Sequence, residues 1–229
     1  MMDIKQLKMS TFDDALNHIT DNIVLGIGSG STIELLVPKI AEKVRAEKLN
    51  IIGVCTSTKT AFIAKEHGLK IVDINDVDHV DIAIDGADEV DSNLNLIKGG
   101  GGALFREKVI DTMAEKFIVI VDETKEVAHL GDKFKLPVEV DKFNWLLLAR
   151  KIEQDQPVIA MRRMADDVPF ITDNGNYILD LELKERLDPY QLHEYLIHLI
   201  GVLETGYFLD TTEAVIFGTQ DGVKIKQRS

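Results

Sequence analysis

The predicted architecture follows from Ile23-Val24-Leu25-Gly26-Ile27-Gly28-Ser29-Gly30-Ser31-Thr32, in which an apolar, β-branched run continues into a glycine-rich turn. Helical spacing follows in the apolar residues Ile33, Leu36, Val37, Ile40, Ala41 and Val44. This order predicts a strand, a tight turn and an amphipathic helix. Ser31 stands three residues before Glu34, as in a capping box, which predicts that the helix begins there.

Four further apolar runs alternate with helix-like stretches and read as strands: Ile51–Cys55, Lys70–Ile74, Val80–Ile84 and Phe117–Val121. Such alternation is typical of parallel strands joined by crossover helices. We therefore expect an α/β fold with a Rossmann-like, mainly parallel sheet.

A second pattern begins near Leu136 and predicts a smaller α+β domain with a ferredoxin-like, split β-α-β layout. Its expected elements are a strand at Pro137–Asp141, a helix at Phe143–Gln154, strands at Val158–Arg163, Val168–Asp173 and Tyr177–Leu183, a helix at Pro189–Ile200 and a strand at Val202–Leu209. Asn174-Gly175 predicts a hairpin between two of these strands. A last hairpin, Ala214–Gly218 with Val223–Lys226, could return to the first sheet. The expected domains are 1–130 plus 207–229, Rossmann-like and catalytic, and 131–206, small and a candidate for oligomerisation.

Composition narrows the classes of partner. The 229 residues carry a net charge of −13 and no basic run, which disfavours nucleic acid and anionic membranes as partners. The N-terminus has no continuous apolar core of a signal peptide, and no apolar stretch reaches the roughly 20 residues of a spanning helix. The single cysteine, Cys55, excludes a disulfide within the chain. We expect a cytoplasmic protein.

The glycine-rich turn predicts a phosphate site, because backbone N–H groups, the positive end of the helix dipole and the hydroxyls of Ser29, Ser31 and Thr32 can cradle an anion. The P-loop pattern fails because no Gly-Lys-Ser/Thr follows, and the dinucleotide pattern fails at Ser31. Thr56–Thr60 is a second candidate for ligand contact, although Ser57 or Thr58 could equally cap the next helix.

The apolar run Val80–Ile84 ends abruptly in three carboxylates, those of Asp85, Asp88 and Glu89. Carboxylates placed this close together repel one another, unless they bind a cation or a polar ligand or work as acid and base. A magnesium site is one alternative, but Lys98 and four glycines follow closely, and a lysine would compete with a cation.

Gly99–Gly102 is costly in backbone entropy, so we expect its N–H groups to face a ligand. Glu107 follows in the next helix and can reach the same ligand if its side chain turns inward. Lys125, just past the strand that ends at Val121, offers a positive charge at the same edge of the sheet.

Taken together, these motifs resemble the type A ribose-5-phosphate isomerases in order and spacing, over nearly the whole chain. The resemblance rests on Gly28–Thr32, Asp85–Glu89, Lys98–Leu104, Arg106–Lys108, Leu136–Val140 and Gly218–Lys224. One departure is Ser29, where the family often has threonine, which keeps the hydroxyl.

The resemblance implies interconversion of ribose 5-phosphate and ribulose 5-phosphate, without metal or cofactor, in a cytosolic homodimer or homotetramer. It implies that Glu107 is the base, that Asp85 and Asp88 assist ring opening and hold the sugar, and that Lys98 faces the developing oxyanion. The implied substrate-binding residues are Ser29, Gly30, Ser31, Thr32, Asp85, Gly86, Ala87, Asp88, Lys98, Gly99, Gly100, Gly101, Lys125 and, more weakly, Lys8.

Two other functions compete. A regulatory domain that senses sugar phosphates would need a DNA-binding head before the phosphate loop, where only about 25 residues stand. Acyl-CoA transfer through a glutamate nucleophile would need a larger chain and leaves the aspartates without a role.

Overall fold

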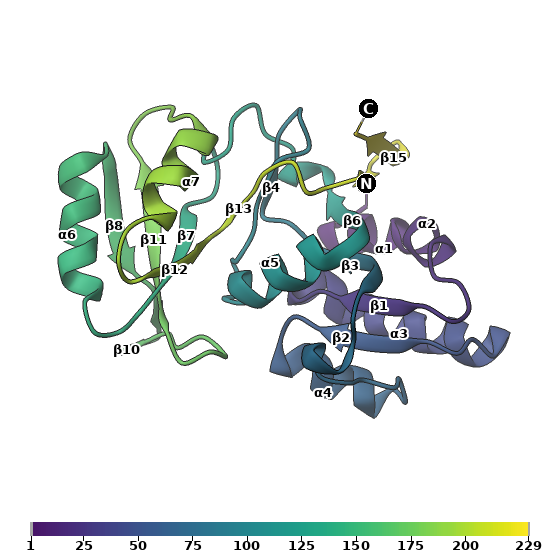
Figure 1. The fold of residues 1–229 in the computed structure, drawn as a ribbon. Coiled ribbons are helices and arrows are strands. Elements are labelled where there is room, and N and C mark those ends of the chain that lie inside the picture. Colours follow the sequence, from purple (N-terminus) through teal and green to yellow (C-terminus); the bar gives the residue numbers. More distant parts are fainter. Residues whose placement is uncertain (1, 229) are drawn as a thin grey trace. The chain divides into compact units, whose positions relative to one another are not determined.

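The computed structural model describes residues 2–228 and divides into two compact units (Figure 1). Unit 1 comprises the chain up to Ala87, Arg106–Lys125 and the chain from Asp210 on, and unit 2 comprises Asp88–Phe105 and Glu126–Leu209. The predicted domain boundaries differ from these units chiefly at residues 88–105, which the sequence pattern placed with the first domain. That segment belongs to unit 2 because its strand Leu96–Ile97 pairs with Glu89–Val90 of the same segment on one side and with Tyr207–Phe208 on the other.

Unit 1 is built on a six-stranded sheet of order β15-β14-β6-β3-β1-β2. The strands are β1 (Val24–Ile27), β2 (Ile52–Cys55), β3 (Val80–Asp85), β6 (Ala114–Asp122), β14 (Ala214–Thr219) and β15 (Gly222–Gln227). Every neighbouring pair is parallel except the β14–β15 hairpin. The predicted α/β class and the returning hairpin are confirmed. Because β1 and β3 are parallel neighbours, Gly28 and Asp85 stand at the same edge of the sheet.

Helices cover both faces of this sheet. Unit 1 contains α1 (Ile4–Ser10), α2 (Phe12–Asn17), α3 (Gly30–Glu47), α4 (Thr58–Glu66), η1 (Ile74–Asp76), α5 (Leu104–Met113, from Arg106 on) and η2 (Glu123–Lys125). Leu25 and Ile27 share one apolar core with α2, α3 and α4. Gly26 points to the other face, where a Cβ atom would lie 2.8 Å from Ile110 of α5, so glycine allows α5 to approach closely.

Two local predictions for unit 1 need correction, and one helix was not predicted. Lys70–Ile74 is not a strand: it forms one bridge, Ile71 to Gly53, before Asp73 caps η1 and redirects the chain. Helix α3 begins at Gly30 with Ser29 as its N-cap, so the predicted capping box at Ser31 is wrong. Helix α1 was not predicted, although Asp3 and Gln6 form a true capping box at its start.

Unit 2 contains a four-stranded antiparallel sheet of order β12-β7-β11-β8. Its elements are β7 (Leu136–Val140), α6 (Trp145–Asp155), β8 (Val158–Arg162), β11 (Tyr177–Leu183), α7 (Pro189–Ile197) and β12 (Val202–Thr205). This β-α-β-β-α-β succession is the ferredoxin-like layout that the sequence predicted. Both helices pack on one face, where they share an apolar core with alternate residues of β7 and β11.

The remaining strands of unit 2 are short. β4 (Glu89–Val90), β5 (Leu96–Ile97) and β13 (Tyr207–Phe208) form a three-stranded sheet that was not predicted, and Gly206 separates β13 from β12. The predicted hairpin of Val168–Asp173 with Tyr177–Leu183 is wrong, because β10 (Val168–Pro169) pairs with β9 (Met164–Ala165). The turn at Asn174-Gly175 exists, but its side chains bind the buried Glu139 instead of extending a ladder. Within residues 2–228 no helix has both the length and the apolar character of a membrane span.

Glu89 fixes a loop of unit 2 from the inside. Its fully buried carboxylate accepts hydrogen bonds from the backbone N–H groups of Gly131, Lys133 and Phe134 at 2.5, 2.5 and 2.6 Å. Burial raises the pKa of Glu89, and the three amides partly offset that rise. Ionisation of Glu89 therefore costs stability as pH rises through the raised pKa, and the amides limit that cost.

Glu89→Gln should lower the free energy of unfolding by about 1–3 kcal/mol, because the glutamine NH₂ group must face an amide N–H that has lost its acceptor. Urea unfolding at neutral pH measures the difference. The exposed Glu185→Gln in the same unit is the matched control and should leave the midpoint unchanged. Equal midpoints for both variants would contradict a stabilising role for Glu89.

Candidate functional site

Asp85 ends β3 with a fully buried carboxylate. Its Oδ1 accepts hydrogen bonds from the N–H groups of Ser29 at 3.0 Å and Gly86 at 2.7 Å. A Cβ atom on Gly28 would lie 2.0 Å from that same oxygen, so glycine is required there. The glycine-rich turn after β1 therefore packs directly over the first carboxylate of the acidic turn, as their shared sheet edge predicts.

Glu107 lies in the first turn of α5 and is 5% exposed. The hydroxyl of Ser29 does not cap α3 but donates to Glu107 Oε1 at 2.7 Å. The side chain of Glu107 therefore turns inward, the condition that the sequence analysis set for it, and is buried beside the glycine-rich turn. The serine hydroxyl fixes the orientation of this carboxylate, which suits a general base.

The N-terminus of α3 carries the other residues of the predicted phosphate site. Gly30, Ser31 and Thr32 form its first turn, where N–H groups point out of the helix. Lys8 of α1 donates from Nζ to Ser31 Oγ at 3.0 Å. The two residues line a cavity of about 690 Å³ together with Ile4, Lys5, Glu34, Leu35 and Ile63. Lys5 is a cation that sequence reasoning missed, because α1 was not predicted.

The structure places Lys125 at the expected edge of the sheet, whereas the Thr56–Thr60 segment caps a helix. Lys125 ends η2, just beyond the carboxyl end of β6, at the edge where β1 and β3 also end. In the other segment, Ser57 is the N-cap of α4 and its Oγ accepts from the N–H of Thr60 at 3.1 Å. Of the two readings left open for Thr56–Thr60, the structure supports the helix cap.

The glycine loop, Lys98–Gly102, belongs to unit 2. Lys98 is 2% exposed, its N–H donates to Gly206 O at 2.9 Å and its Nζ lies 5.3 Å from the centre of the Phe208 ring. Gly99 and Gly102 have φ values of +96° and +83°, which other residues rarely adopt. The N–H of Gly102 donates a hydrogen bond to Gly99 O at 2.9 Å, which closes the turn between the two glycines.

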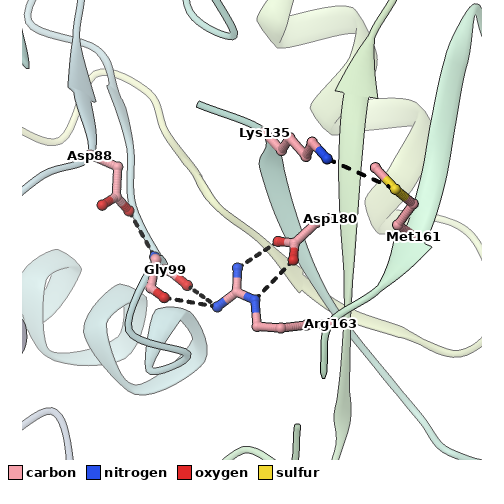
Figure 2. A network of polar contacts seen from close by, with 7 residues as sticks. Asp88, Gly99, Lys135, Met161, Arg163 and Asp180 are labelled. Carbon is pink, nitrogen blue, oxygen red and sulfur yellow. Dashed lines mark hydrogen bonds and ion pairs between the residues drawn. The ribbon is translucent and has the colours of Figure 1, made fainter. Parts of the chain in front are cut away.

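Asp88 is the acidic residue that binds this loop, since its Oδ2 accepts from the N–H of Gly100 at 2.7 Å. On the far side of the same peptides lies Arg163, which donates to the carbonyl groups of Gly99 and Gly100 and is itself held by Asp180 (Figure 2). Neither Arg163 nor Asp180 was predicted. Nothing in their local sequence marks them, because they meet only through the pairing of β8 and β11.

The acidic turn thus has three separate tasks. Asp85 binds the turn after β1, Asp88 binds the glycine loop, and Glu89, which looked like a third member of the site, fixes the loop at 131–134. Gly86 and Ala87, which lie between Asp85 and Asp88 in the chain, are half-buried. Among residues 2–228 no three His, Cys, Asp or Glu side chains are grouped to hold a metal ion.

Comparison with known proteins points in one direction. The chain matches the family model of ribose 5-phosphate isomerase A (phosphoriboisomerase A) over residues 52–222. It is 69% identical over 229 residues to ribose-5-phosphate isomerase A of Staphylococcus haemolyticus and 62% identical over 228 residues to that of Staphylococcus aureus strain COL. Both alignments cover all of each chain.

Solved structures agree with these relatives. A D-ribose-5-phosphate isomerase in complex with phospho-erythronic acid is 40% identical with a TM-score of 0.95, covering 99% of this chain and 100% of the other. The ribose 5-phosphate isomerase of Plasmodium falciparum is 29% identical with a TM-score of 0.94 over the same shares of the two chains. The chain therefore belongs to the ribose 5-phosphate isomerase A family.

Proposed function

We propose that this protein interconverts D-ribose 5-phosphate and D-ribulose 5-phosphate by proton transfer through an enediolate. The observation that carries the proposal is the buried carboxylate of Glu107, oriented by a hydroxyl of the turn that would receive the phosphate. The family membership and the full-length relatives named as isomerases support the same reaction.

Glu107 acts as the base in this proposal. Its carboxylate removes the proton from C2 of the open-chain aldose and returns a proton to C1 of the enediolate. The proton of the C2 hydroxyl passes to the O1 oxyanion, so that O1 becomes the ketose hydroxyl and O2 becomes the ketone oxygen. A positioned carboxylate of this kind contributes about 10²–10⁴ in rate. The hydrogen bond from Ser29 keeps Glu107 in one orientation, so that one oxygen serves both carbons.

Charge that develops on the substrate oxygens needs fixed donors. We assign this role to the ammonium group of Lys98 and to the backbone N–H groups of the Gly99–Gly101 segment. One well-placed oxyanion donor is worth about 2.7–4 kcal/mol, so the loss of Lys98 should harm the rate about as much as the loss of Glu107. Asp85 and Asp88 would assist ring opening and hold the sugar hydroxyls, next to Gly86 and Ala87.

The phosphate group would bind at the N-terminus of α3. Ser29, Gly30, Ser31 and Thr32 offer backbone and hydroxyl donors there, and the helix dipole favours an anion. Lys8 already contacts Ser31 and adds a positive charge. Lys125 stands at the same edge of the sheet and completes the proposed set.

The direct test adds ribose 5-phosphate to purified, chelator-treated protein and follows the formation of ribulose 5-phosphate. The reaction as proposed uses only groups of the chain, so we expect full turnover after chelation. Absence of turnover would refute the isomerase proposal. Turnover that returns only with added magnesium would refute the metal-free mechanism.

Glu107→Gln should lower kcat by about 10²–10⁴ with little change in KM, because the amide keeps the shape of the side chain but cannot accept the C2 proton. Steady-state kinetics in both directions measures this split. Glu115→Gln, an exposed carboxylate on β6, is the control and should match the wild type. A wild-type rate for Glu107→Gln would mean that another group is the base.

We further propose that the protein is a cytosolic homodimer or homotetramer. Unit 2 supports self-association with an exposed apolar surface at the start of α6, where Phe143, Leu147 and Ile200 are 97%, 68% and 91% exposed. Asn144 Nδ2 donates to Ile200 O at 2.9 Å, which brings Ile200 to that end of the helix. Apolar patches of this kind commonly mark contact surfaces.

Sedimentation of the wild type should therefore give the mass of a dimer or tetramer, and Leu147→Glu should shift the distribution toward smaller species at micromolar concentration. Gln154→Glu, at an exposed position of the same helix, is the control and should sediment as the wild type does. A monomeric wild type would contradict self-association, and an unchanged Leu147→Glu would place the interface elsewhere.

A further inference from the structure

Arg163, the residue after β8, is held in a fixed orientation by Asp180 of β11. Its Nε donates to Asp180 Oδ2 at 3.0 Å and its Nη2 donates to Asp180 Oδ1 at 2.5 Å, a two-point fork between guanidinium and carboxylate. The side chains are 13% and 20% exposed, so solvent screens the pair only in part. The ring of Phe170 also lies next to this guanidinium group, with its centre 5.8 Å from the guanidinium carbon.

The third nitrogen of Arg163 reaches the glycine loop. Its Nη1 donates to Gly99 O at 2.8 Å and to Gly100 O at 3.0 Å, so one cation binds two consecutive carbonyl groups (Figure 2). Phe170 also packs against the end of this loop, because a Cβ atom on Gly102 would lie 2.4 Å from its ring. Arg163 and Phe170 thus clamp the loop on the side of its carbonyl groups.

Carbonyl positions determine where the N–H groups of the loop point. In a trans peptide the C=O and the following N–H lie in one plane and point in opposite directions. With Gly99 O on Arg163, the N–H of Gly100 points away from it and donates to Asp88 Oδ2 at 2.7 Å. With Gly100 O also on Arg163, the N–H of Gly101 is directed away from the guanidinium as well.

We infer that Arg163, held by Asp180, is a positioning residue for the isomerisation: it orients the two peptides that join Gly99, Gly100 and Gly101, so that the Gly100 N–H binds Asp88 and the Gly101 N–H faces the developing oxyanion. The inference rests on the proposed function, in which N–H groups of this segment stabilise the enediolate. Consecutive glycines have more backbone freedom than other residues, so this segment needs an external clamp to present its donors in one geometry. A lysine could not replace Arg163, because the role needs a planar group that binds Asp180 and two carbonyl groups together.

Arg163→Ala tests the inference through the split between kcat and KM. Misplacement of catalytic donors by about 1 Å can cost about 10² in rate, so kcat should fall 10-fold to 100-fold while KM changes less than about threefold. A cavity of about 350 Å³ borders the guanidinium, lined by Gly100, Lys133, Phe134, Lys135 and Asp180. Guanidinium ion added at roughly 20 mM, far below denaturing concentrations, should therefore enter the vacated site and restore part of kcat.

Arg162→Ala is the matched control. Arg162 is the neighbouring residue on the chain, and its guanidinium carbon lies over the rings of Trp145 and Tyr177 at 4.2 and 5.1 Å rather than on the glycine loop. Its loss removes a charge and some packing of the same unit, so kcat should stay near that of the wild type and guanidinium should have no effect. If Arg163→Ala does not fold, Arg163→Met keeps the apolar stem over Phe170 and is judged by the kcat and KM split.

Each result has a distinct meaning. A folded Arg163→Ala or Arg163→Met with wild-type kcat would overturn the inference. So would a fall in kcat for Arg163→Ala that guanidinium does not restore, or one that Arg162→Ala shares. A wild-type protein that does not isomerise ribose 5-phosphate refutes the proposed function itself, and this is established before any variant is compared.

Discussion

The hydrogen bond from Ser29 Oγ to Glu107 Oε1 is the contact through which fold and chemistry depend on each other. Burying a carboxylate costs several kcal/mol unless donors replace its hydration, and unit 1 supplies them from one short turn. The hydroxyl of Ser29 donates a hydrogen bond to Glu107 and its N–H donates one to Asp85. Gly28 has no side chain and so leaves space for the aspartate. The parallel pairing of β1 with β3 brings this turn and Asp85 to one edge of the sheet. A change at any of these positions would disturb the proposed base and the phosphate site together.

Unit 2 applies the same principle with backbone donors. Its glycine loop offers N–H groups in place of side chains, and those groups are useful only if their peptides are fixed. Asp88 binds one peptide at its N–H end, and Arg163 binds two at their carbonyl ends. Glu89, one residue after Asp88, accepts three further amides and fixes the next loop. The acidic turn therefore serves as structure and as proposed chemistry at once.

Sequence reasoning recovered what local pattern encodes. The alternation of strands and helices predicted the parallel sheet, and the glycines with their hydroxyls predicted the turn before α3, because both signals are contained within a few residues. It failed where pairing over long distances decides the outcome. The edge segment Lys70–Ile74 has strand composition but forms a single bridge, and Arg163 meets Asp180 only after β8 pairs with β11.

Glu89 was grouped with the site because its sequence neighbours are acidic, whereas its partners lie more than 40 residues away. The signal for α1 was present at Asp3 and Gln6 and was overlooked.

Solvent exchange tests the proposed transfer of a proton between C1 and C2 by a buried carboxylate. The protein is incubated with ribose 5-phosphate in ²H₂O well beyond equilibrium, and the sugars are examined by proton NMR. A proton that passes through Glu107 can exchange with solvent over many turnovers, so we expect deuterium at C1 of ribulose 5-phosphate and at C2 of ribose 5-phosphate. Complete isomerisation with no deuterium at either carbon would mean that hydrogen moves directly between the carbons, which would contradict the enediolate mechanism.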